Sequence, residues 1–312
     1  MLDRAVTDPA ELCRRVGVDP GLASAEAARR FPVLVPEPLL GRIRRGDPDD
    51  PILRQILPVA AELDPAEGFT ADPLGEACHE TCPGQLHRYA GRSLIIATGR
   101  CGVHCRYCFR RCRLEEAASP PIVDRLSEGV REVILSGGDP LTLDDGELES
   151  IVGRLARVGH LRRLRIHSRM PVAIPGRVTD SLLKLLRQTR LTVVVVVQAN
   201  HAAELDAEAG DALGRLVDAG IPVLCQSVLL RGVNDSVDAL AGLLERLIDL
   251  RVMPYYLHQL DRVAGAAHFE VPVSDGRRLV ARLRELLPGY AVPRYVRQVP
   301  DGSSKLLLDG GQ

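Results

Sequence analysis

Leu191-Thr192-Val193-Val194-Val195-Val196-Val197 is the stretch of sequence that decides the fold. Five consecutive valines leave no polar face, so this run predicts a strand buried on both sides, as in a parallel sheet covered by helices. On either side of it, short β-branched runs alternate with longer helical patterns. The six predicted strands are Ser93–Thr98, Glu132–Ser136, Arg163–His167, Leu191–Val197, Ile221–Val228 and Val252–Leu257.

Helical periodicity fills most of the gaps between these runs. It is found near Leu143–Val158, Thr179–Gln188, Glu204–Ala219, Val237–Leu250 and Asp275–Leu287. Six strands alternating with helices predict an α/β fold in which a parallel sheet curls into most of a TIM-like barrel, a partial (β/α)6 barrel. A doubly wound open sheet is the alternative.

The chain ahead of the barrel has few strand signals. A helix is expected to begin at Asp8-Pro9 and to end at Gly17, and a second to cover Ala23–Arg30. We therefore expect three parts: a helical and irregular extension over 1–85, the barrel over 86–290, and a short C-terminal segment over 291–312.

Composition narrows the functional classes. The 312 residues carry a formal net charge of −1 and are 46% apolar. Such a neutral balance argues against nucleic-acid binding as the main role. No stretch approaches the roughly 20 apolar residues of a membrane span, and the first residues lack the apolar core of a secretory signal. The expected compartment is the cytoplasm, where the eight cysteines stay reduced and act as metal or redox ligands.

Three of those cysteines are grouped with the spacing C-x3-C-x2-C, at Cys101, Cys105 and Cys108. Three thiolates on one short loop can bind three irons of a [4Fe–4S] cluster and leave the fourth iron open to a small molecule. Cys112 follows closely, so a structural zinc or a closed cluster with four thiolates is an alternative. Chance grouping without a metal is a third.

Polar and glycine-rich residues follow every predicted strand, and parallel α/β folds place their chemistry at these carboxyl ends. Gly137-Gly138 is either a tight turn or bare backbone for a ligand. His201 alone is typical of a structural hydrogen-bonding residue, and Asp261 of a helix cap or a group that reads charge. Lys305 is either an exposed lysine or one that forms a Schiff base. A set of arginines is either solvated or able to bind carboxylate and phosphate: Arg88, Arg92, Arg100, Arg106, Arg110, Arg111 and Arg113.

The cysteine spacing together with Gly137-Gly138-Asp139-Pro140 resembles the radical S-adenosylmethionine superfamily. Further blocks resemble lysine 2,3-aminomutase and its relatives: Leu86–Tyr89, Cys105–Arg111, Ser136–Pro140, Arg165–Pro171, Gln226–Asp235, Met253–Leu257 and Gly289–Pro293. Within that family, three blocks resemble the short form that supplies β-lysine for elongation factor P: Asp47–Gln55, His258–Asp261 and Gly265–Phe269.

The resemblance implies a role for each matching residue. The three cysteines would ligate the cluster, and S-adenosylmethionine would bind the open iron with help from Gly137, Gly138 and Gln226. Lys305 would be the catalytic lysine and carry pyridoxal 5′-phosphate. Arg88 and Arg92 would hold the phosphate, with Tyr89 near the ring. Arg110 would pair with the substrate carboxylate. The implied reaction moves the amino group of L-lysine from carbon 2 to carbon 3.

One position departs from the family pattern. Lysine aminomutases use two acidic residues to read the ε-ammonium; Asp261 matches the first, and spacing from Lys305 puts the second at Gln298. A neutral amide makes the weaker contact, so glutamate or arginine is an alternative substrate. A rival from another class is a non-catalytic, metal-stabilised binding protein in which Cys112 closes the site.

The resemblance also implies partners. These are a small amino-acid substrate, the elongation factor P pathway, a reductant such as flavodoxin or ferredoxin, and a second copy of the chain in a homo-oligomer. Nucleic acid and membrane are not expected. The longer aminomutases bind a structural zinc through a C-terminal cysteine cluster. This sequence stops at Gln312 and has Ser236 at the remaining zinc position, so no structural zinc is expected.

Overall fold

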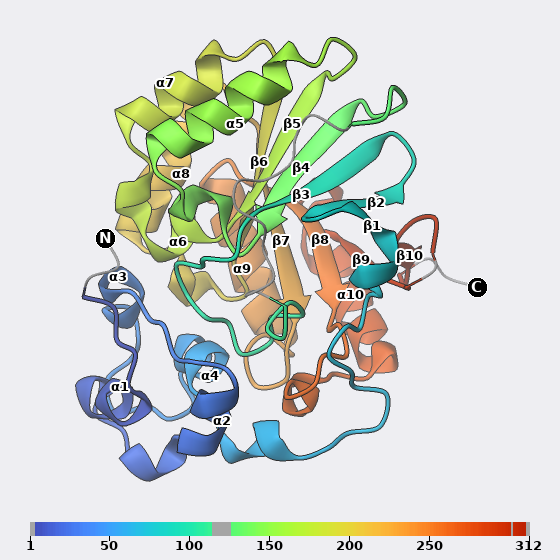
Figure 1. The fold of residues 1–312 in the computed structure, drawn as a ribbon. Coiled ribbons are helices and arrows are strands. Elements are labelled where there is room, and N and C mark those ends of the chain that lie inside the picture. The colour runs from blue at the N-terminus through green and yellow to red at the C-terminus, as the bar shows by residue number, and fades with distance from the viewer. Residues whose placement is uncertain (1–3, 114–125, 301, 310–312) are drawn as a thin grey trace.

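A single ten-stranded sheet forms the centre of the computed structural model, which describes residues 4–113, 126–300 and 302–309 (Figure 1). The strands are β1 Glu80–Cys82, β2 Gln85–Tyr89, β3 Arg92–Thr98, β4 Glu132–Gly137, β5 Arg163–Ser168, β6 Thr192–Gln198, β7 Val223–Leu229, β8 Met253–Gln259, β9 Arg294–Arg297 and β10 Leu306–Leu307. They lie side by side in sequence order. Strands β3 to β9 are parallel, whereas β1, β2 and β10 pair antiparallel at the two edges.

The strand order decides between the two predicted architectures. A doubly wound sheet reverses its order at a switch point, and this sheet keeps one direction from β1 to β10. The predicted partial barrel is therefore confirmed. Within the described residues no pairing joins β1 to β10, so the barrel stays open between these edges.

The six predicted strands correspond to β3 through β8. The valine run forms β6, where Val195, Val196 and Val197 are fully buried, as expected for a strand covered on both faces. The structure adds a seventh parallel strand, β9, whose register with β8 pairs Tyr256 with Arg294.

The helices are α1 Pro9–Val16, α2 Ala25–Arg30, α3 Glu37–Leu40, α4 Pro51–Ile56, α5 Asp145–Arg157, α6 Met170–Ala173, α7 Asp180–Gln188, α8 Ala207–Asp218, α9 Val237–Asp249 and α10 Val273–Leu286. Helices α5 and α7 to α10 match the five predicted in the barrel. Asp144 precedes α5 and forms a capping box with Glu147. The Glu147 backbone N–H donates to the Asp144 carboxylate over 2.7 Å. In the part of the chain that the structure describes, no helix is both long and apolar enough to cross a membrane.

The N-terminal helices cover one end of the barrel. Helix α1 begins at Pro9 after the Asp8 cap and ends at Gly17, whose φ is +78°, as predicted. Figure 1 shows α1 to α4 on the side to which the arrowheads of β7 and β8 point. The buried side chains of Leu12 and Ile52 belong to the same apolar cluster as the barrel core. The carboxyl ends of the strands are therefore covered by this segment.

Candidate active site

A cavity of about 440 Å³ lies inside the open barrel. All thirteen residues to which the sequence assigned a role line it: Arg88, Tyr89, Arg92, Cys101, Cys105, Cys108, Arg110, Gly137, Gly138, Gln226, Asp261, Gln298 and Lys305. Cys112 and His201 do not. Cys112 is exposed, and His201 caps the short turn Ala202–Glu204 by accepting from the Ala203 backbone N–H over 3.1 Å. The position of the thirteen is thus established, and their individual roles stay predictions.

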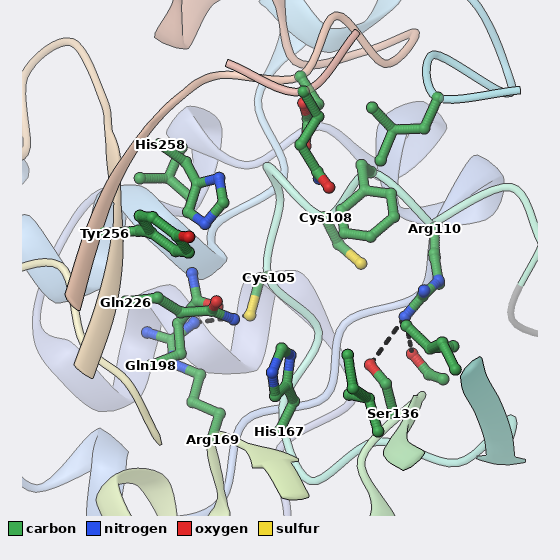
Figure 2. Close-up of a pocket in the computed structure, with 18 of the residues that line it drawn as sticks. Cys105, Cys108, Arg110, Ser136, His167, Arg169, Gln198, Gln226, Tyr256 and His258 are labelled. Carbon is green, nitrogen blue, oxygen red and sulfur yellow. Dashed lines mark hydrogen bonds between the residues drawn. The ribbon is translucent and has the colours of Figure 1, made fainter. Parts of the chain in front are cut away.

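The three cysteines lie on the loop between β3 and β4. Figure 2 shows the sulfurs of Cys105 and Cys108 pointing into the cavity. Burial raises the pKa of the Cys108 thiol to about 12, and burial also raises that of Cys101. A metal that binds these thiols must displace their protons, so binding here is coupled to proton release.

The lining of the cavity is compatible with a cluster bound by the three thiols. Among the described residues, no three His, Cys, Asp or Glu side chains converge as a mononuclear metal site requires. A cluster gives each thiolate its own iron, so three thiols that line one cavity are compatible with it. The exposed Cys112 lies outside the cavity lining, which gives no support to a site closed by a fourth thiolate.

The N-terminal segment holds the cysteine loop in place. The Arg106 side chain is fully buried and donates from Nε and Nη2 to the Glu62 carboxylate over 2.8 and 2.6 Å. Arg111 donates to the same carboxylate over 2.6 Å. The Arg106 backbone N–H also donates to the Gln55 carbonyl over 2.8 Å. Both arginines therefore form ion pairs with Glu62 that hold the cysteine loop in place. They are neither solvated nor available to bind a ligand.

The Gly137-Gly138 pair is required by close packing. Gly137 has a φ of +113°, and a Cβ there would lie 2.7 Å from the Thr98 carbonyl oxygen. A Cβ on Gly138 would lie 2.1 Å from the Arg100 carbonyl oxygen. These glycines let the end of β4 pack against the start of the cysteine loop, and a contact with S-adenosylmethionine stays a prediction.

Lys305 lines the same cavity and directly precedes β10. It is half-buried, and its Nζ donates to Gln298 Oε1 over 2.7 Å and lies 5.6 Å from the centre of the Tyr256 ring. Burial lowers the pKa of its amine to about 8, with Arg88 and Arg92 contributing in the same direction against the opposing charge of Asp261. A lysine with this pKa has a usable fraction of neutral amine near pH 7, as Schiff-base chemistry needs.

Close to that lysine are buried donors without a protein partner. In the described chain, Arg88 Nε and Nη2, Arg92 Nε and the Tyr89 hydroxyl are buried and make no hydrogen bond. The two guanidinium groups lie 5.3 and 4.8 Å from the centre of the Tyr89 ring. Buried donors of positive charge fit an anionic group such as a phosphate, which would supply the missing acceptors.

Arg110 already has a protein partner. Its Nε and Nη2 donate to the two carboxylate oxygens of Glu76 over 2.8 and 2.7 Å, and its Nη1 donates to Ser136 Oγ over 2.9 Å (Figure 2). A guanidinium has five donors, so little of the Arg110 fork remains free for a substrate carboxylate. Sequence reasoning missed Glu76, because it lies in the irregular segment before β1 and its burial depends on Arg110.

Two further groups of the cavity are neutral imidazoles. Burial lowers the pKa of His167 and of His258 well below the usual range, with nearby Lys305 acting in the same direction. His167 Nε2 is buried and has no partner among the described residues. Its position at the end of β5 was the available sequence signal. Asp261 is an acidic group of the same cavity. Burial raises the pKa of its carboxyl to about 6.

Comparison with known proteins places this chain in a family. No protein-family model matches the chain. The L-lysine 2,3-aminomutase of Escherichia coli (strain K12) is 42% identical over 97% of this chain and 92% of its own length. The Haemophilus influenzae protein of that name is 38% identical over 98% of this chain and 94% of its own length. The Clostridium subterminale protein is 38% identical over 85% of this chain and 66% of its own length.

A solved structure, that of Streptococcus suis SuiB, overlaps 68% of this chain and 50% of that chain with a TM-score of 0.49 and 12% identity. The strand order and the site lining described above define the class: a partial parallel barrel with a three-cysteine loop at its strand ends. Within this class, the chain belongs to the L-lysine 2,3-aminomutase family.

Proposed function

We propose that the protein is an isomerase that converts L-lysine to β-lysine by moving its amino group from carbon 2 to carbon 3. One observation carries the proposal: the cysteine triad and Lys305 line one cavity in a chain that is 42% identical to an L-lysine 2,3-aminomutase. The three thiolates would ligate a [4Fe–4S] cluster with an iron left open for S-adenosylmethionine, and Lys305 would hold pyridoxal 5′-phosphate. When bound, these cofactors supply radical chemistry and an electron sink for the migrating nitrogen.

The residues of this chain supply binding, orientation and exclusion of water. Arg88 and Arg92 provide buried donors for the phosphate, and their charges help to keep Lys305 available as a neutral amine. The neutral imidazoles of His167 and His258 bring hydrogen-bonding capacity without adding positive charge beside that amine. The N-terminal helices cover the barrel end. The ion pairs of Glu62 with Arg106 and Arg111 hold the cysteine loop over that end. Where a cofactor carries the chemistry, the protein contributes positioning and the exclusion of competing reactions.

Substrate recognition divides between the two ends of the amino acid. Asp261 would read the ε-ammonium, and Arg110 would contribute to the carboxylate from whichever donors Glu76 leaves free. For the product, we propose delivery to elongation factor P. The support is the resemblance of three sequence blocks to the short form and the coverage of 92–94% of the Escherichia, Buchnera and Haemophilus relatives.

A second candidate is an aminomutase for glutamate or arginine, and of these two the neutral Gln298 favours glutamate. The amide hydrogen-bonds both Lys305 and Asp261, where lysine aminomutases would place a second carboxylate. One carboxylate reads a cationic substrate less strongly than two. A cytoplasmic location, a flavodoxin-like or ferredoxin-like reductant and a homo-oligomer complete the proposal. All three rest on the family resemblance and on the need to keep the cysteines reduced.

The test is an anaerobic assay of the reconstituted protein. It contains iron, sulfide, pyridoxal 5′-phosphate, S-adenosylmethionine, a reductant and, in separate reactions, lysine, glutamate and arginine. Chromatography with mass detection identifies β-amino products. β-Lysine as the main product supports the first candidate, and β-glutamate or β-arginine supports the second. A panel without any β-amino product, with the cluster present, rejects both.

A further inference from the structure

The side chain of Arg169 joins the cysteine triad to a buried polar network. It follows β5 and is 6% exposed. Its Nη1 donates to Cys105 Sγ over 2.6 Å and to the Tyr107 hydroxyl over 3.0 Å. Figure 2 shows Arg169 and Cys105 side by side at the wall of the cavity. Cys105 therefore has a permanent positive charge in direct contact with its sulfur.

A carboxylate from another strand end holds this guanidinium. Arg169 Nη2 donates to Glu204 Oε2 over 2.7 Å and to Gln55 Oε1 over 3.0 Å. Glu204 is fully buried, and its Oε1 accepts from the backbone N–H of Asn200 over 2.8 Å and from that of His201 over 3.0 Å. With its acceptors filled, Glu204 is fixed in one orientation, and it fixes Arg169 in turn.

Gln55 extends the network to the N-terminal helices. It lies on α4, and its Nε2 donates to Glu204 Oε1 over 3.1 Å while its Oε1 accepts from Asn200 Nδ2 over 2.9 Å. Three segments that are far apart in the sequence thus meet behind one cysteine. A buried network with this many hydrogen bonds specifies a single geometry for the group that it surrounds.

We propose that Arg169 tunes the electron affinity of the cluster through Cys105, and that Glu204 and Gln55 are positioning residues that keep its guanidinium on the sulfur. The inference rests on the proposed function, because it takes the cysteine triad to ligate the cluster. Reduction adds negative charge to a cluster, and both a hydrogen bond to a ligand sulfur and a nearby cation stabilise the reduced form. Arg169 therefore makes the cluster easier to reduce.

The experiment is a redox titration of the reconstituted cluster, followed by electron paramagnetic resonance without substrate. Arg169→Gln removes the charge and should lower the ratio of reduced to oxidised cluster at a fixed potential roughly tenfold, which is 59 mV for one electron. Arg169→Lys keeps the positive charge but loses the branched guanidinium that contacts several partners at once. The cluster potential should therefore shift in the same direction as in Arg169→Gln, but by less. The matched control is Arg177→Gln, a buried arginine that donates to the Leu141 carbonyl and lies outside the cavity lining.

Glu204→Asp tests the positioning residue at constant charge. It withdraws the carboxylate by one methylene, so the cluster potential should shift in the same direction as in Arg169→Gln. If Arg169→Gln does not bind a cluster, Arg169→Lys and Glu204→Asp carry the test. Potentials equal to the wild type in the Arg169 variants overturn the inference alone, and an unshifted Glu204→Asp overturns the positioning role. A wild-type chain that binds no cluster overturns the proposed function, and the inference with it.

Discussion

Lys305 Nζ donates to Gln298 Oε1 over 2.7 Å, and the same Gln298 side chain hydrogen-bonds Asp261. One amide thus connects the lysine expected to hold the cofactor with the carboxylate expected to read the substrate. Because the amide is neutral, it satisfies the lysine without forming an ion pair. This contact is compatible with the lowered pKa of Lys305, about 8, which an added carboxylate at 298 would raise.

Gln298→Asp should improve recognition of lysine if lysine is the natural substrate. A hydrogen bond to a charged group exceeds a neutral one by ~1 kcal/mol, which corresponds to about a fivefold lower KM for lysine. Steady-state kinetics at saturating cofactor measure the effect, with Gln298→Asn as the control for amide geometry. A higher KM for lysine together with lost glutamate turnover would instead point to an anionic substrate.

Lys305 should capture pyridoxal 5′-phosphate with a pH dependence set by its amine. The pKa of about 8 is lower than usual, so the neutral amine is about one tenth of the total at pH 7 and predominates above pH 8. The capture rate should therefore rise with pH and level off above about 8. Imine absorbance follows the rate, and borohydride with peptide mass analysis locates the adduct.

The chain offers a matched control for this reaction, because Lys184 is its other lysine and is exposed on α7. Lys305→Ala should abolish the adduct, and Lys184→Ala should leave it unchanged. An adduct that persists in Lys305→Ala would remove Lys305 from the cofactor assignment.

Asp261 should impose an acid limit on lysine turnover. Its carboxyl has a pKa raised to about 6 and becomes neutral as the pH falls below that value, so the attraction for the ε-ammonium is lost on the acidic side. We expect kcat/KM to drop about tenfold per pH unit below 6. The Asp261→Asn variant should have a low kcat/KM at every pH and should not show this decrease below pH 6. A wild-type profile that stays flat from pH 7 to pH 5 would be inconsistent with Asp261 as the charge reader.

Glu76 and Arg110 form a buried ion pair, with side chains 11% and 7% exposed. Glu76→Gln leaves the guanidinium without its counter-charge and should lower the free energy of unfolding by about 3 kcal/mol. Chemical denaturation measures the loss. The control is Glu285→Gln, which breaks an exposed pair with Arg282 on α10 and should cost less than about 1 kcal/mol. Equal losses in the two variants would show that the buried pair carries no special stabilisation.

The cysteine assignments can be tested by iron content. Cys105→Ser should lose the cluster, whereas Cys112→Ser should keep about 4 Fe per chain, because only the first lies in the cavity lining. Iron and sulfide analysis after anaerobic reconstitution provides the measurement. Loss of iron in Cys112→Ser would favour the closed site that the sequence left open as an alternative.

The sequence predicted the strands whose composition is determined by burial. The valine run of β6 and the strands β3, β4, β5 and β7 carry β-branched residues that suit a covered sheet, and β8 carries two tyrosines. It did not predict β9, which has four residues and two arginines, or β10, which has two residues. Such short polar strands form because an adjacent strand supplies the hydrogen bonds, and that information lies outside their own sequence.

The same distinction applies to the site. Motif spacing brought out the cysteines and Lys305, because their chemistry demands those residue types. The partners of the arginines did not follow from the sequence: Glu62, Glu76 and Glu204 are separated from Arg106, Arg110 and Arg169 by 44, 34 and 35 residues. Each of these carboxylates can be buried in its charged form only when the fold brings its arginine into contact with it. Contacts of this kind are set by tertiary packing, which a single sequence does not display.

The most direct test follows one nitrogen atom. Lysine labelled with 15N at its α-amino group is incubated anaerobically with the reconstituted protein, S-adenosylmethionine and reductant, and the products are examined by NMR. The account predicts β-lysine with the label on carbon 3, and no such product from the Cys105→Ser or Lys305→Ala protein. Label that remains on carbon 2 in a protein with an intact cluster and bound pyridoxal 5′-phosphate would contradict it.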